Sequence, residues 1–366
     1  MIRKSKNFDL KRHNTFGMKV KAALYLEYSS ENDLRSVPWD ELPRPLMCIG
    51  SGSNLLFTGD FPGTLLHSKI KFIEEVESRC SGDDVFVRVG SGVEMDDFCA
   101  WASGKDLWGV ENLSAIPGTV GASAVQNVGA YGAEAGDVID SVECFEPATG
   151  CFVNLSAADC AFAYRDSYFK HNRGRYIVTA VVFHLYSDLR PRLDYGNLRE
   201  AVERNIELYQ SPSDPYSCVY DPKYVPQMPL SVSLVRETVK IIREEKLPDP
   251  SKTGSAGSFF KNPVVPADVY ERVVLKAQSL KGSDVKVPHF DLDDSMVKIP
   301  AAWLIDCCGL KGASLGGASL WPTQPLVIVN THGEAEPEDI LALEAKIVST
   351  VESTFGITLT PEVDHI

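Results

Sequence analysis

Glycine and small polar residues dominate the stretch that decides the fold: Ala115-Ile116-Pro117-Gly118-Thr119-Val120-Gly121-Ala122-Ser123, followed by Gln126-Asn127-Val128-Gly129-Ala130-Tyr131-Gly132. The stretch carries almost no charge, although ordinary surface loops are rich in charged residues. A loop wrapped around a large uncharged ring system and a pyrophosphate would have this composition, because glycine lets the backbone approach a ligand closely. A buried, close-packed turn would have it too, and composition alone leaves both interpretations open.

A second glycine loop, Gly50-Ser51-Gly52-Ser53-Asn54, follows the short apolar run at residues 46–49. Its backbone N–H groups, with Ser and Asn side chains, offer donors to a phosphate. By itself the loop favours a plain tight turn. Its spacing is not G-x-G-x-x-G and no helical pattern follows at once, so a dinucleotide-binding Rossmann unit is disfavoured.

Working outward from these loops, the first half of the chain predicts short strands separated by glycine turns, with one short helix at 94–102. The predicted strands lie at 46–49, 85–89 and 176–183. The second half predicts helices at 198–205, 234–245, 301–308 and 337–355, a buried strand at 326–329 and an irregular proline-rich insert at 211–229. Strands with glycine turns and few long helices indicate an α+β fold.

Length and composition restrict the class of protein. A chain of 366 residues is too long for one ordinary core, so two or three domains are expected. A net charge of −14 argues against a nucleic-acid partner. No apolar run approaches the roughly 18 residues of a spanning helix, and residues 1–14 lack the apolar region of a signal peptide, so no membrane association and a cytoplasmic location are expected. The nine scattered cysteines indicate reduced thiols rather than disulfides, and we expect no metal site.

Several segments together resemble one enzyme family along nearly the whole chain. The two glycine-rich pieces at 115–122 and 126–132 are similar to the flavin-embracing segment of the UDP-N-acetylenolpyruvoylglucosamine reductases. That family has the FAD-binding fold typified by vanillyl-alcohol oxidase and p-cresol methylhydroxylase. The further matching segments, in chain order, are Tyr164-Arg165-Asp166-Ser167, Tyr195-Gly196, residues 246–250, residues 257–263, residues 302–306 with 309–312, and Pro361-Glu362-Val363.

The resemblance implies the chemistry as well as the fold. It implies non-covalently bound FAD, with NADPH as co-substrate, and reduction of the enolpyruvyl double bond of a UDP-sugar during peptidoglycan precursor synthesis. Three residues carry over as catalytic: Ser258 would protonate C2, and Arg165 and Glu362 would stabilise the charge that develops at the substrate carboxylate. Without the family match, Ser258 would be taken for a loop hydroxyl and Arg165 for a surface residue.

The resemblance also implies binding residues. Those expected to hold FAD are Gly50, Ser51, Gly52, Ser53, Asn54, Leu55, Ile116, Pro117, Gly118, Thr119, Gly121, Ala122, Gln126, Asn127, Gly129, Ala130, Tyr131 and Gly132. Those expected to bind the substrate are Tyr164, Tyr195, Lys246, Asn262 and Gln324. Tyr195, Lys246 and Asn262 would hold its diphosphate, for which a lysine ammonium is a suitable point charge.

The implied organisation is an FAD-binding domain at 14–188, a connector at 189–245 and a substrate-binding domain at 246–366. The FAD domain would divide into α+β subdomains at about 14–76 and 77–188, and residues 357–366 would return to the active site. Tyr195-Gly196 points to the family type that closes a tyrosine loop over the substrate. Two features depart from the family: the insert at about 206–230 and the tail Asp364-His365-Ile366, whose Asp364 adds negative charge. We expect a monomer.

Two other functions are compatible with parts of the sequence. An FAD oxidase of the same fold, acting on an alcohol or a sugar, would lack the Ser258 segment and would often carry a histidine for covalent flavin. A sugar-nucleotide-binding protein without catalysis would keep the glycine loops but lose Ser258, Arg165 or Glu362. All three residues are present, and none of the seven histidines lies in the flavin-like loops.

Overall fold

The computed structural model describes residues 2–210, 230–292 and 295–366, and these form two compact units. The first unit contains the described residues of Tyr25–Gly50 and Thr64–Glu245 with the first few residues of the chain. The second contains Ser5–Leu24, Ser51–Gly63 and the described residues of Lys246–Ile366. The predicted domains are defined by the ligand that each part of the chain would bind. A division into compact units does not test which ligand a part binds, so the predicted boundaries stay a prediction.

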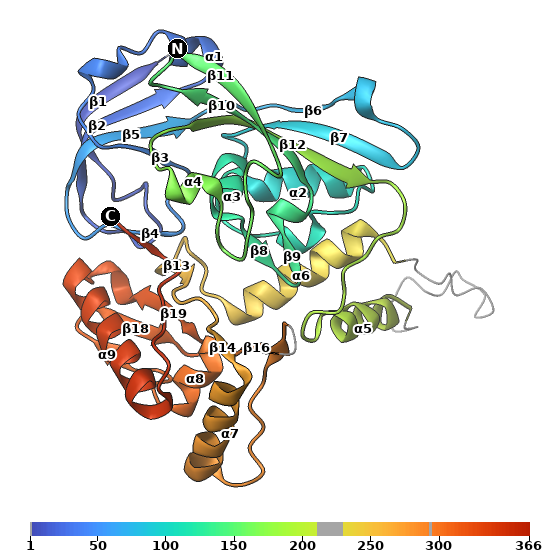
Figure 1. Ribbon diagram of the computed structural model, residues 1–366, viewed down its shortest axis with the longest axis vertical. Coiled ribbons are helices and arrows are strands. Elements are labelled where there is room, and N and C mark those ends of the chain that lie inside the picture. The colour runs from blue at the N-terminus through green and yellow to red at the C-terminus, as the bar shows by residue number, and fades with distance from the viewer. Residues whose placement is uncertain (1, 211–229, 293–294) are drawn as a thin grey trace, which may run out of the picture. The chain divides into compact units, whose positions relative to one another are not determined.

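A five-stranded sheet organises the first unit, in the order β11-β10-β12-β7-β6 (Figure 1). Its strands are β6 (Ile73–Glu75), β7 (Asp84–Gly90), β10 (Ile139–Glu146), β11 (Cys151–Ser156) and β12 (Ile177–Tyr186), and all neighbours are antiparallel. Alternate residues such as Val87 and Phe183 are fully buried and pack in one core with Phe98 of α2 (Met95–Gly104) and Val120 of α3 (Val120–Gln126).

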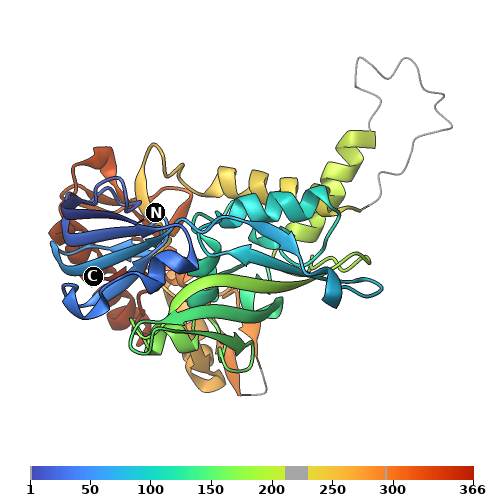
Figure 2. The same cartoon turned by 90° about the horizontal axis from the view of Figure 1, so that it is seen from above.

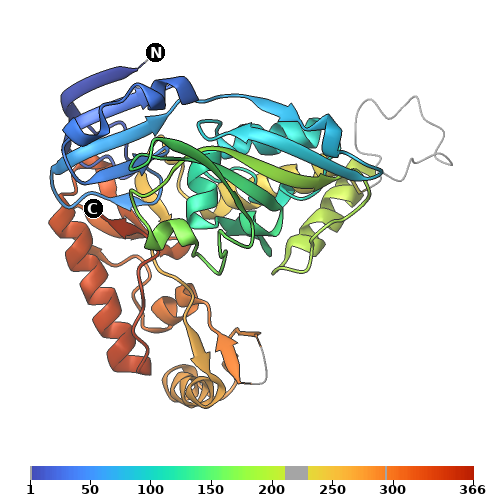
Figure 3. The same ribbon diagram turned by 45° about the horizontal axis from the view of Figure 1, so that its top comes forward.

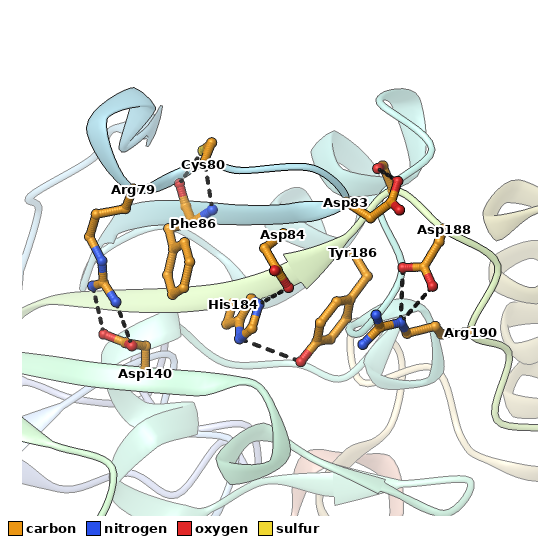
Figure 4. A network of polar contacts seen from close by, with 11 residues as sticks. Arg79, Cys80, Asp83, Asp84, Phe86, Asp140, His184, Tyr186, Asp188 and Arg190 are labelled. Carbon is orange, nitrogen blue, oxygen red and sulfur yellow. Dashed lines mark hydrogen bonds and ion pairs between the residues drawn. The ribbon is translucent and has the colours of Figure 1, made fainter.

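The opposite face of this sheet carries partly exposed charged and aromatic side chains, which we call the outer ladder: Arg79, Asp84, Phe86, Asp140, His184, Tyr186 and Arg190 (Figure 4). Arg79 makes two 2.8 Å hydrogen bonds to Asp140 and covers the ring of Phe86 at 4.0 Å. His184 stacks on Phe86 and lies 2.7 Å from Asp84. Strand alternation therefore separates an apolar inner face from a polar outer one.

Two helices of the first unit share a second, smaller core. These are α5 (Leu198–Gln210) and α6 (Val232–Lys246), which Figure 2 shows in yellow-green and yellow. Leu198 and Val202 of α5 pack in one cluster with Val235 and Val239 of α6. The regularly spaced apolar residues that predicted both helices form the face that each helix buries here.

The second unit is built on the sheet β13-β19-β18-β17 and the smaller sheet β14-β16-β15. The smaller sheet lies beside α7 (Figure 3). The strands are β13 (Gly254–Ser258), β14 (Val264–Pro266), β15 (Phe290–Asp291), β16 (Met296–Lys298), β17 (Ser314–Leu315), β18 (Ala318–Trp321) and β19 (Gln324–Asn330). The helices are α7 (Ala267–Lys281), α8 (Ala301–Cys307) and α9 (Pro337–Phe355). Buried Ile340, Leu343, Ile347, Val351 and Phe355 form the inner stripe of α9, and Gly356 ends it at φ 70°.

The remaining strands form a four-stranded sheet, β1-β2-β5-β3, and two pairs, β20-β4 and β8-β9. Their bounds are β1 (Arg3–Asp9), β2 (Lys21–Tyr28), β3 (Leu46–Ile49), β4 (Leu55–Leu56), β5 (Phe61–Ser68), β8 (Gly129–Ala130), β9 (Ala133–Glu134) and β20 (Asp364–His365). Short helices are α1 (Glu31–Arg35) and α4 (Tyr168–His171), with 3-10 turns at Trp39–Glu41, Glu77–Arg79, Glu111–Leu113, Ala135–Asp137 and Thr331–Gly333. Figure 1 marks the C end of the chain beside β4.

The predicted strands and helices are confirmed with small shifts of their ends, except that the glycine-rich stretch is more ordered than a loop. Its centre is the helix α3, with the Thr119 side chain accepting from Ala122 N. Helix α7 had no prediction, because only Val273 and Ala277 are buried and its apolar stripe is weak. The predicted insert at 211–229 lies outside the described residues.

Three sequence expectations concern absences. Eight of the cysteines are described, and all eight are free thiols. Within the described residues no cluster of His, Cys, Asp and Glu could hold a metal ion. In the same part of the chain no helix is both long and apolar enough to cross a membrane.

Candidate active site

The two glycine segments predicted to bind FAD meet in the first unit. Gly50 follows β3, and a Cβ atom there would lie 2.9 Å from Thr119 Oγ1 and 3.0 Å from Ala122 Cβ. A Cβ atom on Gly121 would lie 2.8 Å from Ser91 Cβ. Because β-carbons do not fit at these points, Gly50 allows the end of β3 to approach the start of α3, and Gly121 allows α3 to approach Ser91, which follows β7. Ile116, Pro117 and Gly118 lead into α3, and Gly118 O accepts from Met95 N at 2.8 Å.

Backbone strain is concentrated in the same part of the first unit. Among the described residues, eight that are not glycine have φ between 45° and 61°, and four of them belong to or adjoin the predicted site: Ala115, Asn127, Tyr131 and Arg165. Such conformations cost about 1–3 kcal/mol each, and they persist where surrounding contacts hold them. The Asn127 side chain is held by three hydrogen bonds of 2.8 Å. Its Nδ2 donates to Glu134 Oε2 and to Ala163 O, and its Oδ1 accepts from Gly136 N.

Arg165 is fixed against the hairpin β8–β9. Its Nη2 donates to Gly129 O at 2.5 Å, its Nη1 lies 3.9 Å from Glu134 Oε1, and its guanidinium is 5.3 Å from the ring centroid of Tyr164. The side chain is only 16% exposed. Nearby, Lys170 Nζ donates to Gln126 Oε1 at 2.8 Å. The structure therefore brings predicted catalytic Arg165 together with predicted binding residues Tyr164 and Gly129.

The Tyr131-Gly132 turn, which follows Ala130, meets Tyr195. The two tyrosine rings lie edge to face with centroids 6.4 Å apart, and a Cβ on Gly132 would lie 3.1 Å from Tyr195 Cβ. Tyr195 is 38% exposed. Asn112, which is 1% exposed, donates to Tyr131 O at 2.7 Å and to Arg192 O at 2.8 Å. Its Oδ1 is buried and has no hydrogen-bond partner among the described residues, so an acceptor is left for a ligand or a water.

Two arginines of α6, which no sequence motif indicated, support this site. Arg243 Nε donates to Ala115 O at 3.2 Å, and its side chain also bonds the Tyr131 hydroxyl. Burial lowers the pKa of Arg243, although Tyr131 opposes this shift. Arg243 has no carboxylate partner within the described part of the chain.

Arg236 acts on the same loop through an aspartate. It bonds both oxygens of Asp96 at 2.5 and 3.1 Å, and Asp96 Oδ1 accepts from Ala115 N at 2.6 Å. Arg236 and Arg243 are seven residues apart, on the stripe that also carries Val232, Val239 and Ile242. In the sequence, the two arginines could have been found as cations on an otherwise apolar helix face.

The other FAD-binding candidates, residues 51–55, lie in the second unit. Gly52 O accepts from Thr15 N at 3.2 Å. Asn54 Nδ2 donates to Glu362 O at 3.1 Å, and Leu55 pairs with Asp364 in the parallel bridge β4–β20. Ser51 and Ser53 complete this loop.

The predicted catalytic Ser258 and Glu362 are neighbours in the second unit. Ser258 ends β13, and the next residue, Phe259, accepts from Glu362 N at 2.8 Å. Phe260 forms a bridge with Pro361. Gly257, at φ 72°, gives the backbone its bend just before Ser258. The segment at 361–363 is therefore held beside the strand that ends in Ser258.

The substrate-binding candidates of the second unit are less concentrated. Asn262 Oδ1 accepts from Ala301 N at 3.0 Å, so its side chain supports the start of α8. Lys246 O accepts from Thr323 Oγ1 at 2.9 Å, which brings Lys246 close in space to Gln324, the first residue of β19.

Comparison with known proteins matches two different family models to two parts of the chain, and full-length relatives carry one enzyme name. Residues 249–366 match the family described as UDP-N-acetylenolpyruvoylglucosamine reductase, C-terminal domain, and residues 25–156 match the family described as FAD binding domain. UDP-N-acetylenolpyruvoylglucosamine reductase of Bacteroides fragilis (strain YCH46) is 41% identical over 98% of this chain and 99% of that protein. The enzyme of that name from Chromobacterium violaceum is 40% identical over 97% and 96%.

Solved structures agree with the fold. UDP-N-acetylenolpyruvylglucosamine reductase from Thermus caldophilus superposes with a TM-score of 0.62, at 22% identity, over 100% of this chain and 98% of that one. 6-Hydroxy-D-nicotine oxidase from Arthrobacter nicotinovorans superposes with a TM-score of 0.50, at 12% identity, over 98% and 86%. The predicted α+β fold with an FAD-binding domain and a C-terminal domain is confirmed.

Proposed function

The chain belongs to the UDP-N-acetylenolpyruvoylglucosamine reductase family, and from that premise we propose how its own residues carry out the reaction. It is an FAD-dependent oxidoreductase that reduces UDP-N-acetylglucosamine enolpyruvate to UDP-N-acetylmuramate with NADPH, in peptidoglycan precursor synthesis. Its substrates are small molecules, and we propose that it works in the cytoplasm as a monomer.

The first unit has features suited to FAD. The absence of a β-carbon at Gly50 lets the end of β3 approach α3, and its absence at Gly121 lets α3 approach Ser91. The buried Asn112 Oδ1 is an acceptor that has no donor among the described residues. We propose that Gly50, residues 116–122 and residues 126–132 hold FAD through backbone and amide groups. When bound, FAD supplies the hydride chemistry, which amino-acid side chains do not provide.

The chain's own residues supply charge and protons. Reduction of the enolpyruvyl group places negative charge next to a carboxylate. A cation held in a partly buried position stabilises that charge more than one in water, because the local dielectric is low. Arg165, 16% exposed and fixed on Gly129, is suited to this role. Ser258 would then deliver the proton to C2, and Glu362 would act at the substrate carboxylate together with Arg165.

One observation carries the assignment of Ser258 and Glu362: the 2.8 Å hydrogen bond from Glu362 N to Phe259 O. It joins the residue that follows Ser258 to the glutamate across about 100 residues of sequence. The bond holds the two segments side by side, which supports a shared role for the two residues. Tyr164, Tyr195, Lys246, Asn262 and Gln324 are proposed to bind the substrate, with Lys246 as a point charge on its diphosphate.

Stopped-flow absorbance of the bound flavin tests the proposal. In Ser258→Ala, bleaching by NADPH should keep its normal rate, because that half-reaction needs no proton on a substrate carbon. Recovery of absorbance with the enolpyruvyl substrate should slow by roughly 10²–10⁴, the usual worth of a general acid. Ser255→Ala, on the same strand, is the control and should change neither rate more than about twofold.

Two outcomes would contradict the assignment. If Ser258→Ala slows bleaching and leaves recovery intact, the serine has another role. If the wild-type protein takes up no FAD on titration, the function itself is wrong.

A further inference from the structure

Glu344 on α9 is a buried carboxylate to which no role has been assigned. Its side chain is 12% exposed, and its Oε2 is buried without a hydrogen bond of ordinary geometry to any described residue. The cation beside it is His365, whose Nε2 lies 3.1 Å from that oxygen. A buried carboxylate that loses its counter-ion destabilises the fold strongly. The ion pair therefore stabilises the position of the C-terminal strand that carries His365.

His365 is attached to the strand β20, which runs parallel to β4. Asp364 N donates to Asn54 O at 3.0 Å, and Ile366 N donates to Leu56 O at 2.9 Å. Thr58 N donates in turn to Ile366 O at 2.8 Å. The His365 ring also lies 6.0 Å, centroid to centroid, from the ring of Phe259. A parallel pair of two residues is too short to be stable alone, so side-chain contacts must hold it.

The same strand leads directly from Glu362. The backbone of Glu362 is held on one side by its N–H bond to Phe259 O, at 2.8 Å, and on the other by the bond from Asn54 Nδ2 to its carbonyl, at 3.1 Å. The bond from Asn54, which adjoins β4, depends on the register of β20 against β4, because a slip of one residue would turn Asp364 and His365 to the opposite faces.

We propose that His365 is a positioning residue for the reaction: its ion pair with Glu344 clamps β20 against β4 and thereby fixes Glu362 relative to Ser258 and to residues 51–55. The inference rests on the proposed function for the roles of Glu362 and Ser258. The clamp itself is defined by contacts within the second unit. It also gives the departing tail Asp364-His365-Ile366 a purpose.

The clamp should weaken as the pH rises. The charged groups that face His365 are Glu344 on α9 and Asp364 on its own strand. The bond to Glu344 is the main cause that raises the pKa of His365, burial acts in the opposite direction, and the charge of Asp364 also raises it. A raised histidine pKa means that the stabilisation is present at low pH and is lost as the pH rises through that pKa. Deprotonation then leaves Glu344 without a counter-ion.

Hydrogen exchange of the full-length protein tests the clamp without any measurement of activity. In His365→Gln the amides of Asp364, Ile366 and Thr58 should exchange about tenfold faster than in the wild type. His365→Arg keeps the charge and should restore slow exchange. The double variant His365→Gln/Glu344→Gln should exchange more slowly than His365→Gln alone, because it no longer buries an uncompensated carboxylate.

Stopped flow tests the consequence for the reaction, at a temperature where every variant is folded. In His365→Gln, recovery of flavin absorbance with the enolpyruvyl substrate should be about three- to tenfold slower at pH 7, with bleaching by NADPH within twofold of normal. The wild-type recovery rate should fall on the alkaline side, and His365→Arg should lack that fall. A merely structural pair would lower the melting temperature without changing the pH profile of recovery.

The experiments distinguish a failure of the proposed function from a failure of the clamp. If the wild type does not oxidise its flavin with the enolpyruvyl substrate, the proposed function is wrong, and exchange still decides the clamp. If the wild type reacts but His365→Gln matches it in exchange and in pH profile, the clamp is overturned.

Discussion

The outer ladder and the glycine-rich segment at 112–132 lie on the same unit, yet they treat polar groups in opposite ways. In the ladder, Arg79 of the 3-10 turn Glu77–Arg79 pairs with Asp140 of β10, and His184 of β12 pairs with Asp84 of β7. In the segment there is little charge, Ala115 and Tyr131 have left-handed backbone, and the Asn112 amide oxygen has no donor in the described chain.

The difference indicates which region is scaffold and which is site. Arg79 and Asp140, and likewise His184 and Asp84, satisfy each other, so these pairs need no further ligand. The segment contains strained backbone and an acceptor without a donor among the described residues. Both features are destabilising, and they are typical of sites that bind a ligand or catalyse a reaction. The following predictions set a change in one region against a matched change in the other.

The largest difference should come from two arginines. Arg165→Ala should lower turnover by roughly 10²–10³, because it removes a positioned, partly buried cation from the reacting charge. Arg79→Ala, in the ladder, should leave turnover within twofold and change the free energy of unfolding by less than about 1 kcal/mol, because its pair with Asp140 is solvent-exposed. Steady-state kinetics and urea unfolding measure both. Equal losses of activity would remove the distinction between the regions.

Two helical glycines give the second comparison. Gly121→Ala should destabilise the protein by about 1–3 kcal/mol and weaken FAD binding, because the new Cβ would lie 2.8 Å from Ser91 Cβ. Gly104→Ala, in α2, meets nothing within 4 Å and should be neutral or stabilising by up to about 1 kcal/mol. Thermal unfolding and fluorescence titration with FAD measure the two effects. A harmless Gly121→Ala would show that the segment has room to spare.

Acid should act on the site through Asp96. Burial alone would raise the pKa of Asp96, but the hydrogen bonds from Arg236 and Ala115 N–H outweigh it and hold the pKa below 3.8. The pair therefore stabilises the protein above the unfolded pKa, and this contribution disappears as the pH falls through the lowered value. Asp96→Asn should lose about 1–2 kcal/mol at neutral pH, toward the low end because the side chain is 39% exposed.

The readout for Asp96 is flavin release on acidification, followed by fluorescence. Wild-type protein should release flavin below about pH 4, and Asp96→Asn should show weaker binding with less dependence on pH. An Asp96→Asn protein with unchanged flavin affinity would mean that the α6 arginines do not support the loop.

The smallest effect is expected from Tyr186→Phe in the outer ladder. The hydroxyl lies 3.4 Å from His184 Nδ1, at the limit of a hydrogen bond, and the ring contacts with His184 and Arg190 remain in the variant. We expect a change in the free energy of unfolding within about 0.5 kcal/mol and unaltered kinetics. A larger loss, measured in urea, would show that the ladder is more cooperative than its pairwise contacts.

The sequence was a good guide wherever pattern and family motif acted locally. Residues 337–355 predicted α9 almost to the residue because its apolar spacing is regular and Pro337 and Gly356 mark its ends. The motifs at 164–167 and 361–363 predicted Arg165 and Glu362 as site residues, and their roles stay predictions. The left-handed backbone of Arg165 and its bond to Gly129 could not be read, because they arise from tertiary contacts.

Long-range support was the least predictable part. Arg236 acts on Asp96 across 140 residues of sequence, and Arg243 acts on Ala115 across 128. Glu344 and His365 are 21 residues apart and meet only in the fold. Composition gave no indication of these pairings. The stretch at 115–132 was compatible with a loop or a close-packed turn, and no helix was predicted in it. Small residues, which are common in loops, also permit a short buried helix such as α3 when a threonine caps it.

The parallel pair β4–β20 has a consequence for biosynthesis. Its strands are about 300 residues apart, and Phe16 and Phe259, which meet edge to face, are also far apart in sequence. At about 5–20 residues per second, a ribosome needs roughly 15–60 s to pass from residue 51 to residue 366. During that interval residues 5–24 and 51–63 have been made but lack most of their partners. The second unit can therefore complete its fold only after residues 357–366 have been made. Until then, either chaperones must protect its early strands or these strands must aggregate only slowly.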